Sequence, residues 1–173
     1  MVASAFLPVT IYKGKLLFLF GKEAHDDSAP GFSDFGGGVE ANENIYEAGL
    51  REMAEETTGF FGNAKDIKKL VKQNGGVYKL NHNNYHVHIF NMSYDPLLPF
   101  YYNNNHKFIY EKLDHGYLKK TMIFEKIEIK WMTVSDMKKQ KSKFRKFYQD
   151  IVVKIIEEEQ KIKQFVTKAI AYT

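Results

Sequence analysis

The chain has 173 residues, 44% of them hydrophobic and 15% aromatic, with 25 basic and 21 acidic residues and a formal net charge of +4. This composition excludes an intrinsically disordered chain and fits one domain, which we expect to span residues 1–173. The absence of cysteine excludes disulfides, thiol catalysis and cysteine-ligated zinc.

The positive charge comes almost entirely from lysine, because Arg51 and Arg145 are the two arginines of the sequence. Lysine acts as a point charge for phosphate, whereas the arginine fork reads base edges. The balance therefore favours a polyphosphate or a nucleic-acid backbone over sequence-specific DNA, with solvated surface lysines as the simplest alternative. The sequence has no basic leader and no apolar run long enough for a membrane span, so we expect a cytoplasmic protein without membrane association.

The first elements in chain order are two strands, a loop and a helix. Apolar runs on both sides of Lys13 and Gly14, within residues 5–23, predict a β-hairpin. Residues 25–38 are rich in turn formers and predict a loop. Asn44 followed by Glu47 is typical of a capping box, so a helix is expected over residues 45–58, with Gly59 just beyond its end.

The second half of the chain gives weaker signals. Residues 75–80 and 84–94 predict strands, and the alternation of residues 125–134 predicts another. Residues 95–120 have mixed signals and predict a long loop or insertion. Apolar residues recur at helical spacing from Ser142 onward and predict one amphipathic C-terminal helix on the sheet. This order of elements favours an α/β or α+β sandwich.

The predicted helix gathers negative charge on one face. Glu52, Glu55 and Glu56 fall together at 3.6 residues per turn, and Arg51 can brace neighbouring carboxylates. Three carboxylates with one arginine leave an excess of negative charge, which Mg²⁺ or Mn²⁺ would neutralise. The glycines at residues 36–38 would let a backbone carbonyl reach the same ion. The alternative is a solvated helix whose glutamates pair with lysines.

The spacing of these residues resembles the signature of the Nudix hydrolases. The match consists of Gly37, five residues, Glu43, seven residues, Arg51, Glu52, two residues, Glu55 and Glu56. The signature usually closes with Glu-Glu-x-Gly and a hydrophobic residue, whereas here the glycine comes one residue late, after Thr57 and Thr58. We therefore expect a longer helix or a different turn at its end.

The resemblance implies an α/β Nudix fold, a mixed β-sheet sandwiched between α-helices. It implies divalent-metal-dependent hydrolysis of a phosphoanhydride bond in a nucleoside diphosphate linked to another group, as in a nucleotide or dinucleotide. Either a carboxylate or water activated by the metal would supply the base. The implied catalytic residues are Arg51, Glu52, Glu55 and Glu56. The implied ligands of Mg²⁺ or Mn²⁺ are Gly36 through its carbonyl, Glu52, Glu55, Glu56 and, from outside the signature, Glu125 in preference to Glu128.

Other readings of the signature remain open. An mRNA cap or an inositol pyrophosphate is the alternative substrate, which the lysine excess favours. The sequence FGGG replaces the lysine-containing lead of decapping relatives and argues against capped RNA. A non-catalytic nucleotide-sensing module is the third reading, and the presence of all three glutamates argues against it. A homodimer is compatible with the sequence.

Three further features have two readings each. His82, His86 and His88 suggest zinc, but without a fitted ligand set a polar sheet face is favoured. Residues 138–150 interleave basic and aromatic side chains, which can bind RNA. We favour instead the start of an amphipathic helix with Phe144 and Phe147 buried. Residues 99–112 are read as a substrate lid, a dimer contact or a surface loop, and the sequence does not decide among them.

Overall fold

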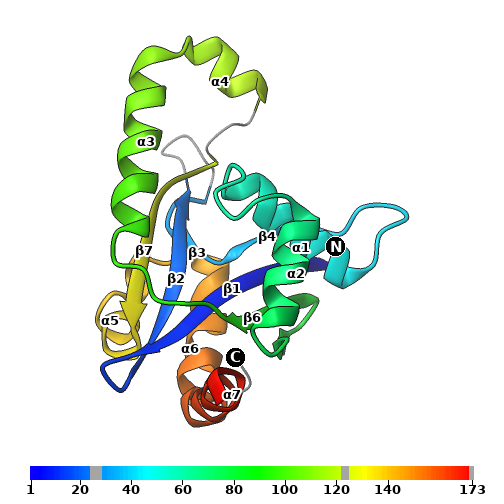
Figure 1. The fold of residues 1–173 in the computed structure, drawn as a ribbon. Helices are drawn as coiled ribbons and strands as arrows, with labels where there is room; N and C mark the ends of the chain where they lie inside the picture. Colours follow the sequence, from blue (N-terminus) through cyan, green and yellow to red (C-terminus); the bar gives the residue numbers. More distant parts are fainter. Residues whose placement is uncertain (24–28, 122–124, 172–173) are drawn as a thin grey trace.

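The computed structural model describes residues 1–23, 29–121 and 125–171. Within these residues, seven strands form one mixed sheet (Figure 1). The strands are β1 (Ala3–Tyr12), β2 (Lys15–Glu23), β3 (Phe32–Ser33), β4 (Phe35–Gly38), β5 (Tyr78–His82), β6 (Tyr85–Asn91) and β7 (Lys126–Thr133).

The long strand β1 organises the sheet. It pairs in parallel with β6 on one side, and on the other side its first half pairs antiparallel with β4 and its second half with β2. The predicted hairpin is confirmed, since Lys13 and Gly14 join β1 to β2 with φ angles of 48° and 74°. Positive φ at both turn residues matches the twist of the two strands. Strand β7 pairs antiparallel with the outer side of β2.

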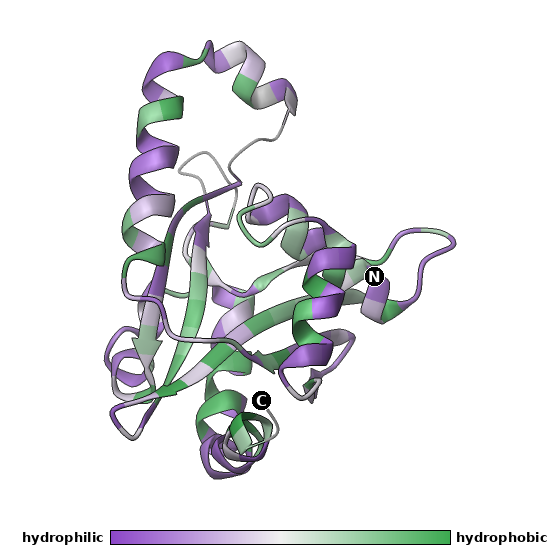
Figure 2. Cartoon of the chain, viewed as in Figure 1, coloured by the Kyte–Doolittle hydropathy of each residue, from purple (hydrophilic) through white to green (hydrophobic). Residues whose placement is uncertain are grey.

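Helices cover both faces of this sheet. The helices of the described residues are α1 (Ile45–Glu56), α2 (Ala64–Gln73), α3 (Leu98–Lys112), α4 (His115–Thr121), α5 (Val134–Lys139), α6 (Gln149–Glu157) and α7 (Glu159–Ala171). One apolar core lies under α1 and α2 and includes Phe6 and Met53, and a second lies under α6 and α7 and includes Phe18 and Ile155. Figure 2 shows mainly hydrophobic colour on the central strands β1 and β2. The predicted sandwich of a mixed sheet between helices is confirmed.

Helix α1 forms and ends for local reasons. The side chain of Asn44 accepts a hydrogen bond from the Glu47 N–H at the first turn, as the predicted cap requires. The helix ends at Glu56, earlier than predicted, and Thr58 and Gly59 follow with φ angles of 50° and 73°. The late glycine therefore gives a different turn and not a longer helix. A β-branched residue at positive φ is unusual, so this turn holds Thr58 in a strained conformation.

The prediction of a loop over residues 95–120 is wrong. Helices α3 and α4 occupy most of this range. Helix α3 begins beside β7, and its far end and α4 project away from the sheet (Figure 1). The Asn103 amide joins α3 to the edge strand, donating to the Ile129 carbonyl at 3.2 Å and accepting from the Ile129 N–H at 2.8 Å. Asparagine and aromatic residues are weak helix formers, which explains why the sequence did not predict helix α3.

Two other element predictions fail. The range 25–38 was expected to be a loop; residues 25–28 lie outside the described part of the chain, but β3 and β4 fall within the remainder. The C-terminal range is not one helix from Ser142, because two 3₁₀ turns, Lys141–Lys143 and Lys146–Tyr148, precede α6 and α7. Helix α2 was not predicted. Among the described helices, none has the length and apolar content that crossing a membrane requires.

Candidate active site

Arg51 is the centre of a hydrogen-bonded cluster on the outer face of α1. Its guanidinium donates to both oxygens of Glu43 (Nε–Oε2 3.1 Å, Nη2–Oε1 2.8 Å) and to the Gly38 carbonyl at 3.0 Å. Its Nη1 contacts Glu52 Oε1 at 2.9 Å and Glu55 Oε2 at 3.0 Å. One cation thus fixes three carboxylates and ties the helix to the strand β4. The predicted bracing role of Arg51 matches this geometry.

The glycine segment β4 lies directly against α1. A Cβ added at Gly37 would come within 2.6 Å of the Glu52 carboxylate, so a larger residue there would displace that side chain. The N–H of Gly36 donates to Glu56 Oε2 at 2.8 Å. The prediction gave Gly36 a role through its carbonyl, whereas the contact that the structure shows is through its amide.

The Glu56 side chain is buried in the protein. Its Oε1 lies 3.0 Å from Nζ of Lys126, and both side chains are buried. Lys126 also forms an ion pair with Glu23 and donates to Ser33 Oγ at 3.1 Å. Glu23 in turn contacts Arg145 Nη1 at 2.6 Å. A continuous row of ion pairs therefore runs from Glu56 through the protein to Arg145.

A β-bulge brings Lys126 into this row. Lys22 pairs with Glu128, but the next residue of β2, Glu23, pairs with Lys126, so β7 has one extra residue at this point. Side chains alternate between the two faces of a strand, and an extra residue reverses the alternation. Lys126 consequently lies on the same face as Glu23 and Glu56.

The helix α3 contributes Tyr102 to the same region. The buried hydroxyl of Tyr102 contacts the backbone carbonyls of Glu56 at 3.1 Å and of Lys126 at 2.9 Å. It therefore holds the end of α1 against the start of β7. Lys126, Glu23 and Tyr102 were not predicted, because no local spacing marks a contact between residues so far apart in sequence.

Glu125 lies near the acidic face and Glu128 does not. Burial, together with the negative charges of Glu23, Glu52 and Glu55, raises the pKa of the Glu125 carboxyl. Glu128 instead lies 3.7 Å from the Lys22 ammonium. Of the two candidates from outside the signature, the structure brings Glu125 to the predicted site.

The pKa values of three carboxyls of the site, Glu43, Glu52 and Glu56, are shifted in different directions. Burial raises the pKa of Glu56 to about 8, and the charges of Glu23 and Glu125 act in the same direction against Lys126. Burial also raises the pKa of Glu52, opposed by its hydrogen bond to Arg51. The hydrogen bond from Arg51 lowers the pKa of Glu43. No group of three or more acids or histidines within the described residues is arranged as a ready metal cluster.

The histidines have structural surroundings. His88 is buried, stacks on Phe6 with ring centroids 4.9 Å apart, and its Nδ1 lies 3.2 Å from the Ala5 carbonyl oxygen. Burial lowers the pKa of His88 to about 4. His86 contacts Asn81 at 3.0 Å. These contacts agree with the favoured reading of a sheet residue over a zinc ligand.

Comparison with models of known families identifies the family of the chain. The profile described as NUDIX domain matches residues 2–152. The chain belongs to the NUDIX family. This membership confirms the resemblance carried by the signature. A comparison with curated protein sequences gives no significant match.

Solved structures share the fold at low sequence identity. A bifunctional NMN adenylyltransferase/ADP ribose pyrophosphatase from Francisella tularensis, complexed with AMP and a Mn ion, aligns at a TM-score of 0.57 with 17% identity over 91% of this chain. The chain spans 41% of the length of that protein. A MutT protein from Methanosarcina mazei Go1 aligns at 0.50 with 16% identity, over 92% of this chain and 94% of that one. The NUDIX domain of Shewanella oneidensis NrtR, complexed with ADP ribose, aligns at 0.50 with 12% identity, over 93% of this chain and 86% of that one.

Proposed function

We propose that the chain hydrolyses a phosphoanhydride bond in a nucleoside diphosphate linked to another group, with Mg²⁺ or Mn²⁺ as cofactor. The observation that carries the proposal is the crowding of acids around α1. Glu23, Glu43, Glu52, Glu55, Glu56 and Glu125 face the cations Arg51, Lys126 and Arg145. The group has more acids than cations, and a divalent cation neutralises such an excess.

The residues present fit such an ion. Their donors are carboxylate oxygens, which hard divalent cations prefer. Burial, together with neighbouring negative charges, raises the pKa values of Glu52, Glu56 and Glu125, and a bound cation would stabilise their charged forms. Each carboxylate oxygen has two acceptor sites, so the contacts of Glu56 with Lys126 and Gly36 leave it free to bind an ion as well.

We propose that Glu52, Glu55, Glu56 and Glu125 hold the metal, with the Gly36 carbonyl as a further ligand. The bound metal would neutralise charge on the phosphoryl oxygens of the substrate. Water attacks one phosphorus, the bridging P–O bond breaks, and a carboxylate accepts the proton of the water. Glu52 suits this role, because burial raises its pKa and makes it a stronger base. Arg51 positions Glu52 and does not contact the substrate.

The first test is a product screen. Wild-type protein is incubated with ADP-ribose, nucleoside triphosphates, dinucleoside polyphosphates, capped RNA and inositol pyrophosphates, each with Mg²⁺, with Mn²⁺ and with EDTA. We expect cleavage of a pyrophosphate link in at least one nucleotide, only in the presence of metal. Cleavage of no compound would reject the proposal, and ligand binding without product would favour the sensing module.

A matched pair of variants tests the site. Glu52→Gln removes the proposed base, whereas Glu47→Gln removes the same charge from an exposed position of the same helix. We expect Glu52→Gln to lower kcat by about 10²–10⁴-fold, the usual contribution of general base catalysis, and Glu47→Gln to change it little. Equal activity of the two variants would contradict the assignment.

A further inference from the structure

Ten residues at the Arg145 end of the ion-pair row form a strongly basic surface. The basic segment (residues 138–147) contains six lysines and arginines and no acidic residue. The expectation of a helix that buries Phe144 and Phe147 is wrong, because only Phe144 is buried and Phe147 is 47% exposed. Lys141, Lys143 and Lys146 are also exposed.

Long-range pairing fixes the middle of the segment, between its two 3₁₀ turns. Phe144 forms an isolated parallel β-bridge with Phe32, and the Arg145 N–H donates to the Phe32 carbonyl at 3.0 Å. Gly31 has a φ of 128°, and a Cβ there would lie 2.7 Å from the Arg145 nitrogen. Only glycine therefore lets the segment lie so close to β3.

A hollow of about 400 Å³ opens beside this segment. Lys22, Lys130 and Lys143 line it, and Glu128, which faces Lys22 at 3.7 Å, is its one acidic residue. Three lysines against one glutamate leave the hollow positively charged. Such a surface attracts phosphate, and its lysines come from three separate segments, β2, β7 and the basic segment.

An aromatic platform lies at the end of the segment. The Arg145 guanidinium lies 5.2 Å from the centroid of the Phe147 ring, and Tyr85 packs against the same ring at 5.7 Å. An exposed aromatic ring held in place beside cations is the usual platform for an unpaired base. Arg145 also connects this surface to Glu56 of α1 through Glu23 and Lys126.

We propose that the basic segment and the hollow bind the phosphodiester backbone of a single-stranded nucleic acid. Lys130 and Lys143 contact phosphates, and a base stacks on Phe147. The inference rests on the proposed function, since it assigns the strand as the group attached to the phosphoanhydride that α1 acts on. Its charge is spread over an extended surface, which suits a chain of phosphates better than one small nucleotide.

The test is equilibrium binding of a short fluorescent RNA, and of DNA of the same sequence, measured by anisotropy in EDTA over a series of salt concentrations. We expect the double variant Lys130→Ala/Lys143→Ala to flatten the slope of log K against log salt by about 1.4, at about 0.7 for each lost phosphate contact. Phe147→Leu, which keeps an apolar side chain, should weaken binding about tenfold through lost stacking. Comparison of the RNA and DNA arms shows whether the surface distinguishes the sugar.

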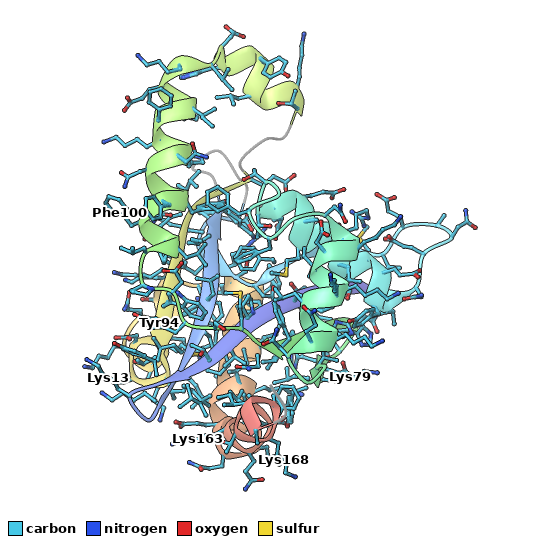
Figure 3. All side chains as sticks on the ribbon, in the orientation of Figure 1. Lys13, Lys79, Tyr94, Phe100, Lys163 and Lys168 are labelled. Atoms are coloured by element: carbon cyan, nitrogen blue, oxygen red, sulfur yellow. The ribbon has the colours of Figure 1, made fainter. Side chains whose placement is uncertain are left out.

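The control is Lys161→Ala/Lys168→Ala, which removes the same charge from exposed positions on α7; Figure 3 shows Lys168 on the outside of that helix. An equal loss of slope in both double variants, or no binding by wild-type protein at low salt, would overturn the inference. Glu47→Gln should bind the strand as tightly as wild type, because Glu47 is exposed on α1 and has no role in the proposed site. Hydrolysis of nucleotides without the specific slope change would reject only this surface, and the slope change without hydrolysis would reject only the proposed function.

Discussion

Replacement of Lys126 by methionine removes the one cation in contact with Glu56 among the described residues. Lys126 is fully buried, and its ammonium lies 3.0 Å from Glu56 Oε1 and 3.1 Å from Ser33 Oγ, with Glu23 as its third partner. Methionine fills the volume of the lysine stem, so little of the loss comes from a cavity. Loss of one partner of a buried ion pair leaves a charge without compensation.

The expected loss of stability in Lys126→Met depends on which contacts Glu23 and Glu56 keep. Glu23 keeps its contact with Arg145 at 2.6 Å, whereas Glu56 keeps only the Gly36 N–H. Because one of the two acids stays paired, we expect the free energy of unfolding to fall by about 3 kcal/mol, the lower end of the usual range for a broken buried pair. The measurement is urea unfolding in EDTA, followed by the fluorescence of Trp131, the single tryptophan.

A double-mutant cycle separates charge from packing. In a Glu56→Gln background no acid remains opposite the ammonium at that position, so Lys126→Met should cost clearly less than in the wild type. The control Lys22→Met removes a lysine whose side chain is 34% exposed and should cost less than about 1 kcal/mol. An equal cost of Lys126→Met in both backgrounds would refute the reasoning, because the loss would then come from packing.

Three further changes test other parts of the structure. Thr58→Gly should raise the free energy of unfolding by about 1 kcal/mol in urea titrations, because glycine adopts a φ of 50° without strain. Tyr102→Phe keeps the ring but removes the hydroxyl between the Glu56 and Lys126 carbonyls, and a thermal unfolding scan should show a loss of about 1–2 kcal/mol. Burial raises the pKa of Asp34 from 3.8 to about 7, so between these pH values the folded state binds one more proton than the unfolded state. Wild-type stability should therefore fall by up to about 1.4 kcal/mol per pH unit across this window relative to Asp34→Asn. Parallel pH dependences of the two proteins would contradict this.

Local signals predicted the hairpin and the acidic helix. Lys13 and Gly14 lie between two apolar runs, and Asn44 supplies a cap that needs only residues next to it in sequence. The contact of Arg51 with Glu55 also follows from helical spacing, because residues four apart meet on one face, whereas its contact with Glu43, before the helix, does not.

Contacts between residues far apart in the chain could not be predicted from local sequence patterns. Lys126 reaches Glu56 only because a bulge reverses the alternation of β7, and alternation alone would have placed Ile127 there. The stretch around Phe144 has the apolar spacing of a helix, but the pairing of Phe144 with Phe32 prevents a continuous α-helix there. In both cases tertiary structure overrides a local pattern, and no spacing rule records the partner.

The crowded acids of α1 are tested most directly by diffraction from a crystal soaked in Mn²⁺, recorded at a wavelength where manganese scatters anomalously. We expect an anomalous peak among the carboxylates of Glu52, Glu55, Glu56 and Glu125, and its loss in crystals of the Glu52→Gln/Glu55→Gln variant. A map of the wild-type crystal with no peak among these four side chains would contradict it.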